Sequence, residues 1–157
     1  MPKTSAGLLV YQFHQNHLQV LLVHPGGPFW KNKDEGAWSI PKGEYSDSED
    51  PLQVALREFE EETGNNIEAT NFIELEAVKQ KGSKLIKAWA VEANIEQPFI
   101  SSNIFEMEWP PRSGKMQQFP EVDKAGWFSI SEAAVKMNAV QFQLVQQLQE
   151  KLGAKVQ

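Results

Sequence analysis

Three glutamates and one arginine lie close together near the middle of this 157-residue chain: Arg57, Glu58, Glu61 and Glu62. In a helix, at about 100° per residue, the three glutamates share an arc of roughly 100°. Like charges at these spacings repel one another, and the C-terminal half of a helix disfavours anions. A hard divalent cation such as Mg²⁺ would relieve this conflict, because it prefers carboxylate and water oxygens. The pattern predicts a metal site; a solvated acidic face is the alternative.

The helix that carries these residues is predicted by its two ends and its apolar face. Asp50 followed by Pro51 provides an N-cap and a first-turn proline, and Gly64 provides a C-terminal stop. Between these ends the residues of one narrow stripe are Leu52, Ala55, Leu56, Phe59 and Thr63. We expect this stripe to be buried, which places the glutamates beside the core at the edge of a cleft.

The segment from Gly43 to Gly64 resembles the Nudix box, the signature of hydrolases that cleave a nucleoside diphosphate linked to another group X. The chain has Gly43, five residues, Glu49, seven residues and then the run REFEEETG. It departs from the family at Asn65, where a bulky aliphatic residue is usual. The resemblance implies an α/β protein with the Nudix fold, a mixed β-sheet sandwiched between α-helices, in a single domain over residues 1–157.

The resemblance also implies which box residues bind the metal. Glu58 and Glu62 match residues that bind the cation directly, and Glu61 matches a residue that binds it or helps to activate water. Gly43 matches a glycine whose backbone carbonyl oxygen binds the metal. The cofactor implied is Mg²⁺, with Mn²⁺ as a possible substitute.

Arg57 and Glu49 match an orienting pair in the same family. In that pair the arginine holds the partner glutamate and the helix carboxylates. A planar guanidinium suits this role because it can bind two carboxylates at once. The alternative for Arg57 and Glu49 is an ordinary surface salt bridge, which contributes little to stability.

Residues outside the box would hold the nucleotide. The loop from Pro25 to Gly36 carries Trp30 among lysines, which suits a stacked base with phosphates nearby, although such a ring can also cover the core. Lys42 precedes the box glycine, so we expect it to reach the phosphates. Arg112 is a further candidate for phosphate binding.

Many Nudix enzymes take an additional base or metal ligand from outside the box. Three glutamates could supply it here: Glu106, Glu108 and Glu121. No fixed spacing selects among them, and each alone is more often a solvated loop charge. We expect Glu106 to take this role, because it occupies a strand-like position before a loop.

Composition excludes several classes of protein. The net charge of −6 argues against stable nucleic-acid binding, and the chain has no cysteine for disulfides or thiolate metal sites. No run of 18 apolar residues predicts a transmembrane helix. We expect a cytoplasmic protein, a monomer or a homodimer, that binds a nucleotide and no membrane.

Hydrophobic periodicity predicts alternating strands and helices around the box. The expected strands cover residues 5–13, 18–24, 37–40, 72–79, 85–93 and 125–129, and a loop-rich segment covers 97–121. We expect Ser131 to cap a helix and a last helix to end at Gly153.

The predicted function is that of a Mg²⁺-dependent pyrophosphohydrolase cleaving a phosphoanhydride bond, with a dinucleoside polyphosphate or a nucleoside triphosphate as the first candidate substrate. One alternative is an ADP-ribose or nucleotide-sugar hydrolase; the ADP-ribose subgroup often has a proline after the box, and none occurs between Gly64 and Gln97. The other alternative is a non-catalytic nucleotide sensor. Such sensors often lose box carboxylates, whereas all are present here.

Overall fold

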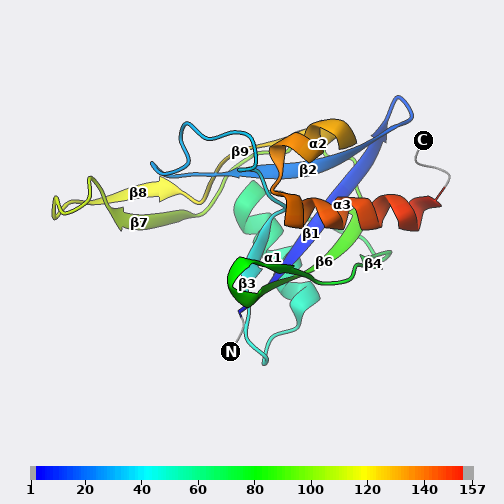
Figure 1. The fold of residues 1–157 in the computed structure, drawn as a ribbon, viewed down its shortest axis with the longest axis horizontal. Coiled ribbons are helices and arrows are strands. Elements are labelled where there is room, and N and C mark those ends of the chain that lie inside the picture. Colours follow the sequence, from blue (N-terminus) through cyan, green and yellow to red (C-terminus); the bar gives the residue numbers. More distant parts are fainter. Residues whose placement is uncertain (1–2, 154–157) are drawn as a thin grey trace.

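The computed structural model describes residues 3–153 and has a seven-stranded sheet at its centre (Figure 1). The main path runs β4-β6-β1-β2-β9, with β3 paired to β1 and β5 paired to β6. Their bounds are β1 Thr4–His14, β2 His17–Pro25, β3 Lys42–Glu44, β4 Ile73–Glu74, β5 Val78–Gln80, β6 Lys84–Glu92 and β9 Val122–Ser129. Strands β1 and β6 run parallel, while β2 and β3 are antiparallel to β1. The sheet is therefore mixed, as predicted.

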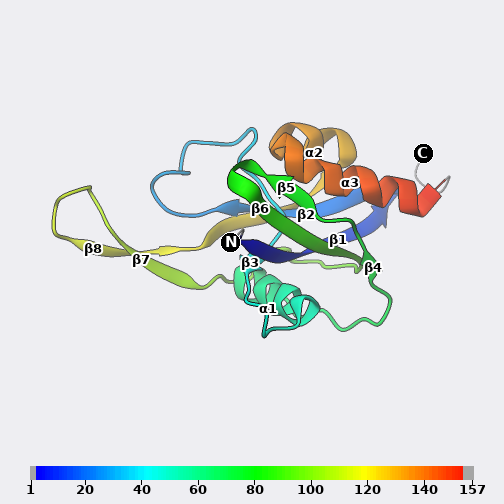
Figure 2. The same ribbon diagram turned by 60° about the horizontal axis from the view of Figure 1, so that its bottom comes forward.

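Helices cover both faces of this sheet (Figure 2). Helix α1 (Pro51–Thr63) lies on one face, and α2 (Ile130–Lys136) and α3 (Ala139–Leu152) lie on the other. Neighbouring residues of β1 face opposite layers: Leu8 packs in the cluster that contains Phe59 of α1, and Leu9 in the cluster that contains Leu148 of α3. Within residues 3–153 we find no helix that is long and apolar enough to cross a membrane.

The box helix begins and ends where the sequence predicts. The Asp50 side chain accepts a hydrogen bond from the backbone N–H of Leu52 at 3.2 Å, and Pro51 is the first helical residue. At the other end Gly64 takes φ = 81°, a left-handed conformation that favours glycine, and its N–H donates to the Glu60 carbonyl at 2.8 Å. Both ends are fixed by local chemistry, which explains why they could be predicted.

The segment predicted to be loop-rich, residues 97–121, also contains two strands that the sequence analysis did not predict. Strands β7 (Ile104–Glu108) and β8 (Met116–Pro120) form a two-stranded hairpin that projects beyond the main sheet (Figure 1). The prolines that suggested a loop lie at its tip and its base, where they do not interrupt the ladder. The alternation of apolar and polar residues from Ile104 to Glu108 was the correct signal.

Three smaller predictions also need correction. Residues 37–40 form no strand: they make only isolated bridges, between Val23 and Ser39 and between Trp38 and Met137. The predicted strand over 72–79 is two short strands, β4 and β5. The cap of α2 is Ser129, whose hydroxyl accepts from the Glu132 N–H while the Glu132 carboxylate accepts from the Ser129 N–H.

Candidate active site

The box glycine lies directly against a box glutamate. Strand β3 pairs with the start of β1, Gly43 opposite Ala6, and α1 packs on this edge. A Cβ atom at Gly43 would overlap the carboxyl group of Glu58. Glycine is required here by close approach rather than by a turn, and it brings the backbone of β3 next to the acidic side of α1.

Arg57 lies among three carboxylates. Its guanidinium nitrogens are 3.4 Å from Glu49 Oε2, 3.8 Å from Glu58 Oε2 and 3.9 Å from Glu61 Oε2. The Glu49 carboxylate also accepts from the backbone N–H of Ser46 at 3.0 Å, and this bond, followed by the Arg57 contacts, lowers the pKa of Glu49. The guanidinium is half exposed, so solvent screening leaves each pair little effect on stability. Its effect is to orient the carboxylates.

Glu62 is the buried acid of the cluster, with 7% of its surface exposed. Burial, followed by repulsion from Glu58, raises its pKa to about 9, although the nearby Lys42 lowers it. The pKa of Glu58 is also raised, first by burial and then by the Glu61 charge. Ionised carboxylates in this position therefore need a compensating positive charge.

The donor atoms of the cluster suit a hard divalent cation, since carboxylate and carbonyl oxygens are the ligands that Mg²⁺ prefers. In the side-chain conformations of residues 3–153, however, no three Asp, Glu, His or Cys side chains are close enough together to hold a metal ion. Glu58 and Glu61 are instead turned toward Arg57. Rotation of these two side chains would be needed for the carboxylates to converge.

A glutamate outside the box also lies beside this cluster. The Asn103 N–H donates to the Glu61 carbonyl at 2.9 Å, and the Glu121 N–H donates to the Asn103 carbonyl at 2.8 Å. Two backbone hydrogen bonds thus tie Glu121 to the end of α1. Its charge contributes to the raised pKa of both Glu58 and Glu62, although it is a smaller cause than burial.

Glu106, the preferred candidate from the sequence, lies elsewhere. It is exposed on β7 and accepts from the Gln118 side chain, its cross-strand partner, at 3.4 Å. Arg112 lies at the hairpin tip, where the Glu108 carboxylate accepts from the N–H groups of Arg112 and Gly114. The structure brings neither Glu106 nor Arg112 to the box, and Glu108 caps the tip.

The two remaining candidates are Lys42 and Trp30. Lys42 is half-buried next to Gly43, and its charge acts on Glu62, so it belongs to the cluster. Trp30 lies in the loop after β2 with 40% of its surface exposed, and the Lys33 ammonium is 5.1 Å from the centre of its ring. Lys42 and Glu121 both lie beside the cluster, and the sequence had favoured Glu106 over Glu121.

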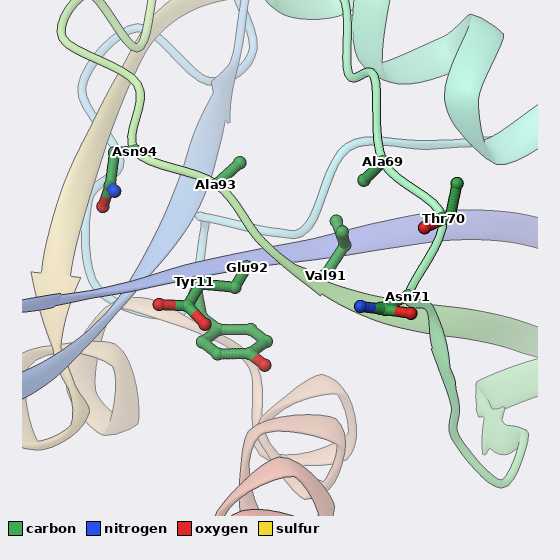
Figure 3. A pocket seen from close by; sticks show the side chains of 8 residues that line it. All are labelled: Tyr11, Ala69, Thr70, Asn71, Val91, Glu92, Ala93 and Asn94. Atoms are coloured by element: carbon green, nitrogen blue, oxygen red, sulfur yellow. The ribbon is translucent and has the colours of Figure 1, made fainter.

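A cavity of about 650 Å³ lies away from this cluster (Figure 3). Tyr11, Glu92, Asn71 and Asn94 line it, at the end of β1 opposite to the box. Because Gly43 pairs with Ala6, five residues before Tyr11 on β1, the separation along the strand is about 17 Å. The candidate active site is therefore the carboxylate cluster and not this cavity.

These features define a class of protein: a mixed sheet between helices, with a carboxylate cluster on the helix that covers one face. The NUDIX domain family model matches residues 1–148, so the chain belongs to the NUDIX domain family and is a Nudix hydrolase. A comparison with curated protein sequences returned no significant match.

Solved structures of the family have the same fold at low sequence identity. A binary complex of the C. elegans Ap4A hydrolase matches with a TM-score of 0.66 and 21% identity over 94% of this chain and 97% of that one. A mutT/nudix family protein from Listeria innocua matches at 0.65 and 17%, over 97% and 95% of the two chains. The NUDIX domain of Shewanella oneidensis NrtR, complexed with ADP ribose, matches at 0.63 and 17%, over 97% and 89%.

Proposed function

We propose that this Nudix hydrolase cleaves a phosphoanhydride bond in a dinucleoside polyphosphate or a nucleoside triphosphate, using Mg²⁺. The observation that carries the proposal is the complete carboxylate cluster of the box, arranged around Arg57. The Ap4A hydrolase neighbour supports the first of these substrates by fold alone.

Glu58, Glu62 and Glu61 would hold the cation together with the Gly43 carbonyl oxygen, and Mn²⁺ could replace Mg²⁺. When bound, such a cation neutralises phosphate charge and lowers the pKa of water. The raised pKa values of Glu58 and Glu62 are consistent with this assignment, because a divalent charge between them would favour both ionised forms.

The other residues of the cluster would position and transfer protons. Arg57, paired with Glu49, would orient Glu58 and Glu61, which would turn from the guanidinium to bind the cation. Lys42 would contact a phosphate oxygen with its ammonium. Among the carboxylates outside the box, we assign the proton-accepting role to Glu121 in place of Glu106, because Glu121 lies beside Glu58 and Glu62.

The test is hydrolysis of a nucleotide panel with Mg²⁺, beside the Glu62→Ala protein. The panel contains diadenosine tetraphosphate, nucleoside triphosphates, ADP-ribose and nucleotide sugars, and the readout is phosphate released through a coupling phosphatase. We expect turnover of a polyphosphate that requires Mg²⁺ and falls by orders of magnitude in the variant. Equal rates in the two proteins would refute the assignment.

Two alternatives have their own outcomes in the same panel. Preferred turnover of ADP-ribose would identify the chain as an ADP-ribose hydrolase, the alternative that the ADP ribose complex of the NrtR domain suggests. Nucleotide binding without turnover of any substrate would make the chain a sensor that retains its box.

A further inference from the structure

A cleft of about 520 Å³ lies between the loop after β2 and the β7–β8 hairpin. Aromatic rings of Trp109 and Phe119 line it, with Lys31, Gln117 and Asp123 among the polar residues. Its volume is in the range of small-molecule sites, and its lining combines apolar rings with a few polar groups. No box residue lines it, and Gly27, Pro28 and Lys31 come from the loop that the sequence predicts to hold the nucleotide.

Two glycines allow the walls of this cleft to approach each other. A Cβ at Gly26 would overlap the Pro120 carbonyl oxygen, and the Gly26 N–H donates to the Glu121 carbonyl at 2.9 Å. A Cβ at Gly27 would be 3.0 Å from the Phe105 ring. The loop is therefore packed directly on the hairpin, and the cleft has a defined width.

Aromatic and polar contacts fix the two walls further. The rings of Phe29 and Trp109 meet edge to face with centroids 5.4 Å apart. The buried His24 ring has Asp123 Oδ1 2.8 Å from Nδ1 and the Lys33 carbonyl oxygen 2.6 Å from Nε2. His24 thereby joins the loop to the start of β9 behind the cleft.

The hairpin register decides which of its side chains face the cleft. Phe105 pairs with Phe119 and Met107 with Gln117, and because paired residues share a face, these four lie on one side. Glu106 belongs to the other side.

Backbone hydrogen bonds connect the wall of the cleft to the end of α1. Glu121 lies in the chain between two lining residues, Pro120 and Asp123, and its carbonyl oxygen accepts from the Gly26 N–H at 2.9 Å. The Glu121 N–H donates to the Asn103 carbonyl oxygen at 2.8 Å, and the Asn103 N–H donates to the Glu61 carbonyl oxygen at 2.9 Å. A ligand with its phosphates at the box would have the rest of the molecule close to this cleft. Lys31 gives the cleft a cation for a phosphate oxygen at its rim.

We propose that this cleft binds the nucleobase of the substrate, with the ring stacked against Trp109 and Phe119. The inference rests on the proposed function for its placement beside the phosphates. Stacking on aromatic rings recognises any base through its π-face, which makes Trp109 a determinant of nucleotide affinity rather than a catalytic residue.

The test is an NMR titration of the protein with AMP and with ribose 5-phosphate, in EDTA, so that neither metal nor turnover is involved. The readout is the indole N–H signal that disappears in Trp109→Phe. We expect AMP to shift this signal and ribose 5-phosphate to leave it unchanged. Trp109→Ala should weaken AMP binding by about tenfold or more, while Trp109→Phe stays within about threefold of the wild type.

Met116→Ala is the matched control, because Met116 is exposed on the other face of the same hairpin. It should bind AMP as the wild type does. Equal affinity for AMP and ribose 5-phosphate, or unchanged AMP binding in Trp109→Ala, would overturn the inference.

Kinetics with Mg²⁺ separate this inference from the proposed function. If both hold, Trp109→Ala raises KM for the hydrolysed nucleotide with little change in kcat, and Met116→Ala changes neither. Hydrolysis with an unchanged KM in Trp109→Ala overturns the inference alone. Trp109-dependent AMP binding in a protein that hydrolyses no nucleotide supports the inference and refutes the proposed function.

Discussion

The box helix and the β7–β8 hairpin differ in how they are held. Helix α1 is capped at both ends, packs Phe59 into the core and meets β3 through the close contact of Gly43 with Glu58. The hairpin is a separate two-stranded sheet that projects beyond the main sheet and is held by contacts with the loop after β2, such as that between Phe29 and Trp109. The reactive groups are thus on a helix packed against the core, and the proposed base cleft is on a separate projecting element. Such a separation allows specificity to change without altering the chemistry.

The largest effect should come from the buried acid of the box. Glu62→Gln should lower kcat by about 10³-fold or more, because the variant loses a charged oxygen donor for the cation. Glu60→Gln is the matched control, since Glu60 lies in the same helix but is exposed on another side. Steady-state rates with Mg²⁺ give the comparison, and similar losses in both variants would contradict a specific role for Glu62.

The contact between β3 and α1 gives the next largest effect. Gly43→Ala should lower kcat by roughly 10- to 100-fold, because the added methyl group displaces the Glu58 carboxyl. Gly126→Ala is the control, since a Cβ there would meet Phe128 at an ordinary 3.6 Å. Full activity in Gly43→Ala would mean that Glu58 can act from another position.

Substitutions of Glu121 and Glu106 compare a glutamate beside the box helix with one on the hairpin. Glu121→Gln should lower kcat by about tenfold or more, as expected for a proton acceptor or ligand beside the cluster. Glu106→Gln should stay within about twofold, because Glu106 is exposed on a strand that projects beyond the main sheet. The reverse order of effects, measured with the same substrate, would return the role to Glu106.

The smallest effect is on stability in the absence of metal. The pKa of Glu62 is raised from 4.5 to about 9, so the native state binds this proton more tightly than the unfolded state. The resulting stabilisation is complete below about pH 4.5 and is lost as the pH rises to about 9. In EDTA, the free energy of unfolding should therefore fall between pH 6 and 8.5 by on the order of 1 kcal/mol or more.

Glu62→Gln provides the comparison for this measurement, because its amide does not titrate. Urea unfolding of the variant should show a smaller decrease over the same pH range. Parallel pH profiles in the two proteins would show that Glu62 does not hold its proton in the native state.

The sequence predicts the box helix well because its information is local. The Asp50 cap, the Gly64 stop and the apolar stripe all act within a few residues, and the family pattern adds the roles of the glutamates. The position of Glu121 depends instead on Asn103 and on hydrogen bonds between distant segments. No local spacing encodes such contacts, and for this reason the sequence alone favoured Glu106.

The hairpin is a second feature that the sequence did not predict. Its prolines were read as loop signals, although the alternating segment from Ile104 to Glu108 carries a strand pattern. The cleft is formed only when the loop after β2 packs on this hairpin, so its aromatic lining could not be assembled from the sequence. Trp109 and Phe119 are correspondingly absent from the predicted site.

The most direct test of the carboxylate cluster as a metal site is proton release on Mn²⁺ binding. Because Glu62 has a pKa of about 9, it holds a proton at pH 7 that must leave when its carboxylate binds a cation. Calorimetric titrations at pH 7 in two buffers of different ionisation enthalpy should give about one proton released per Mn²⁺ bound. The proton should not be released in Glu62→Gln. Mn²⁺ binding without proton release in the wild type, or with the same release in the variant, would contradict the account.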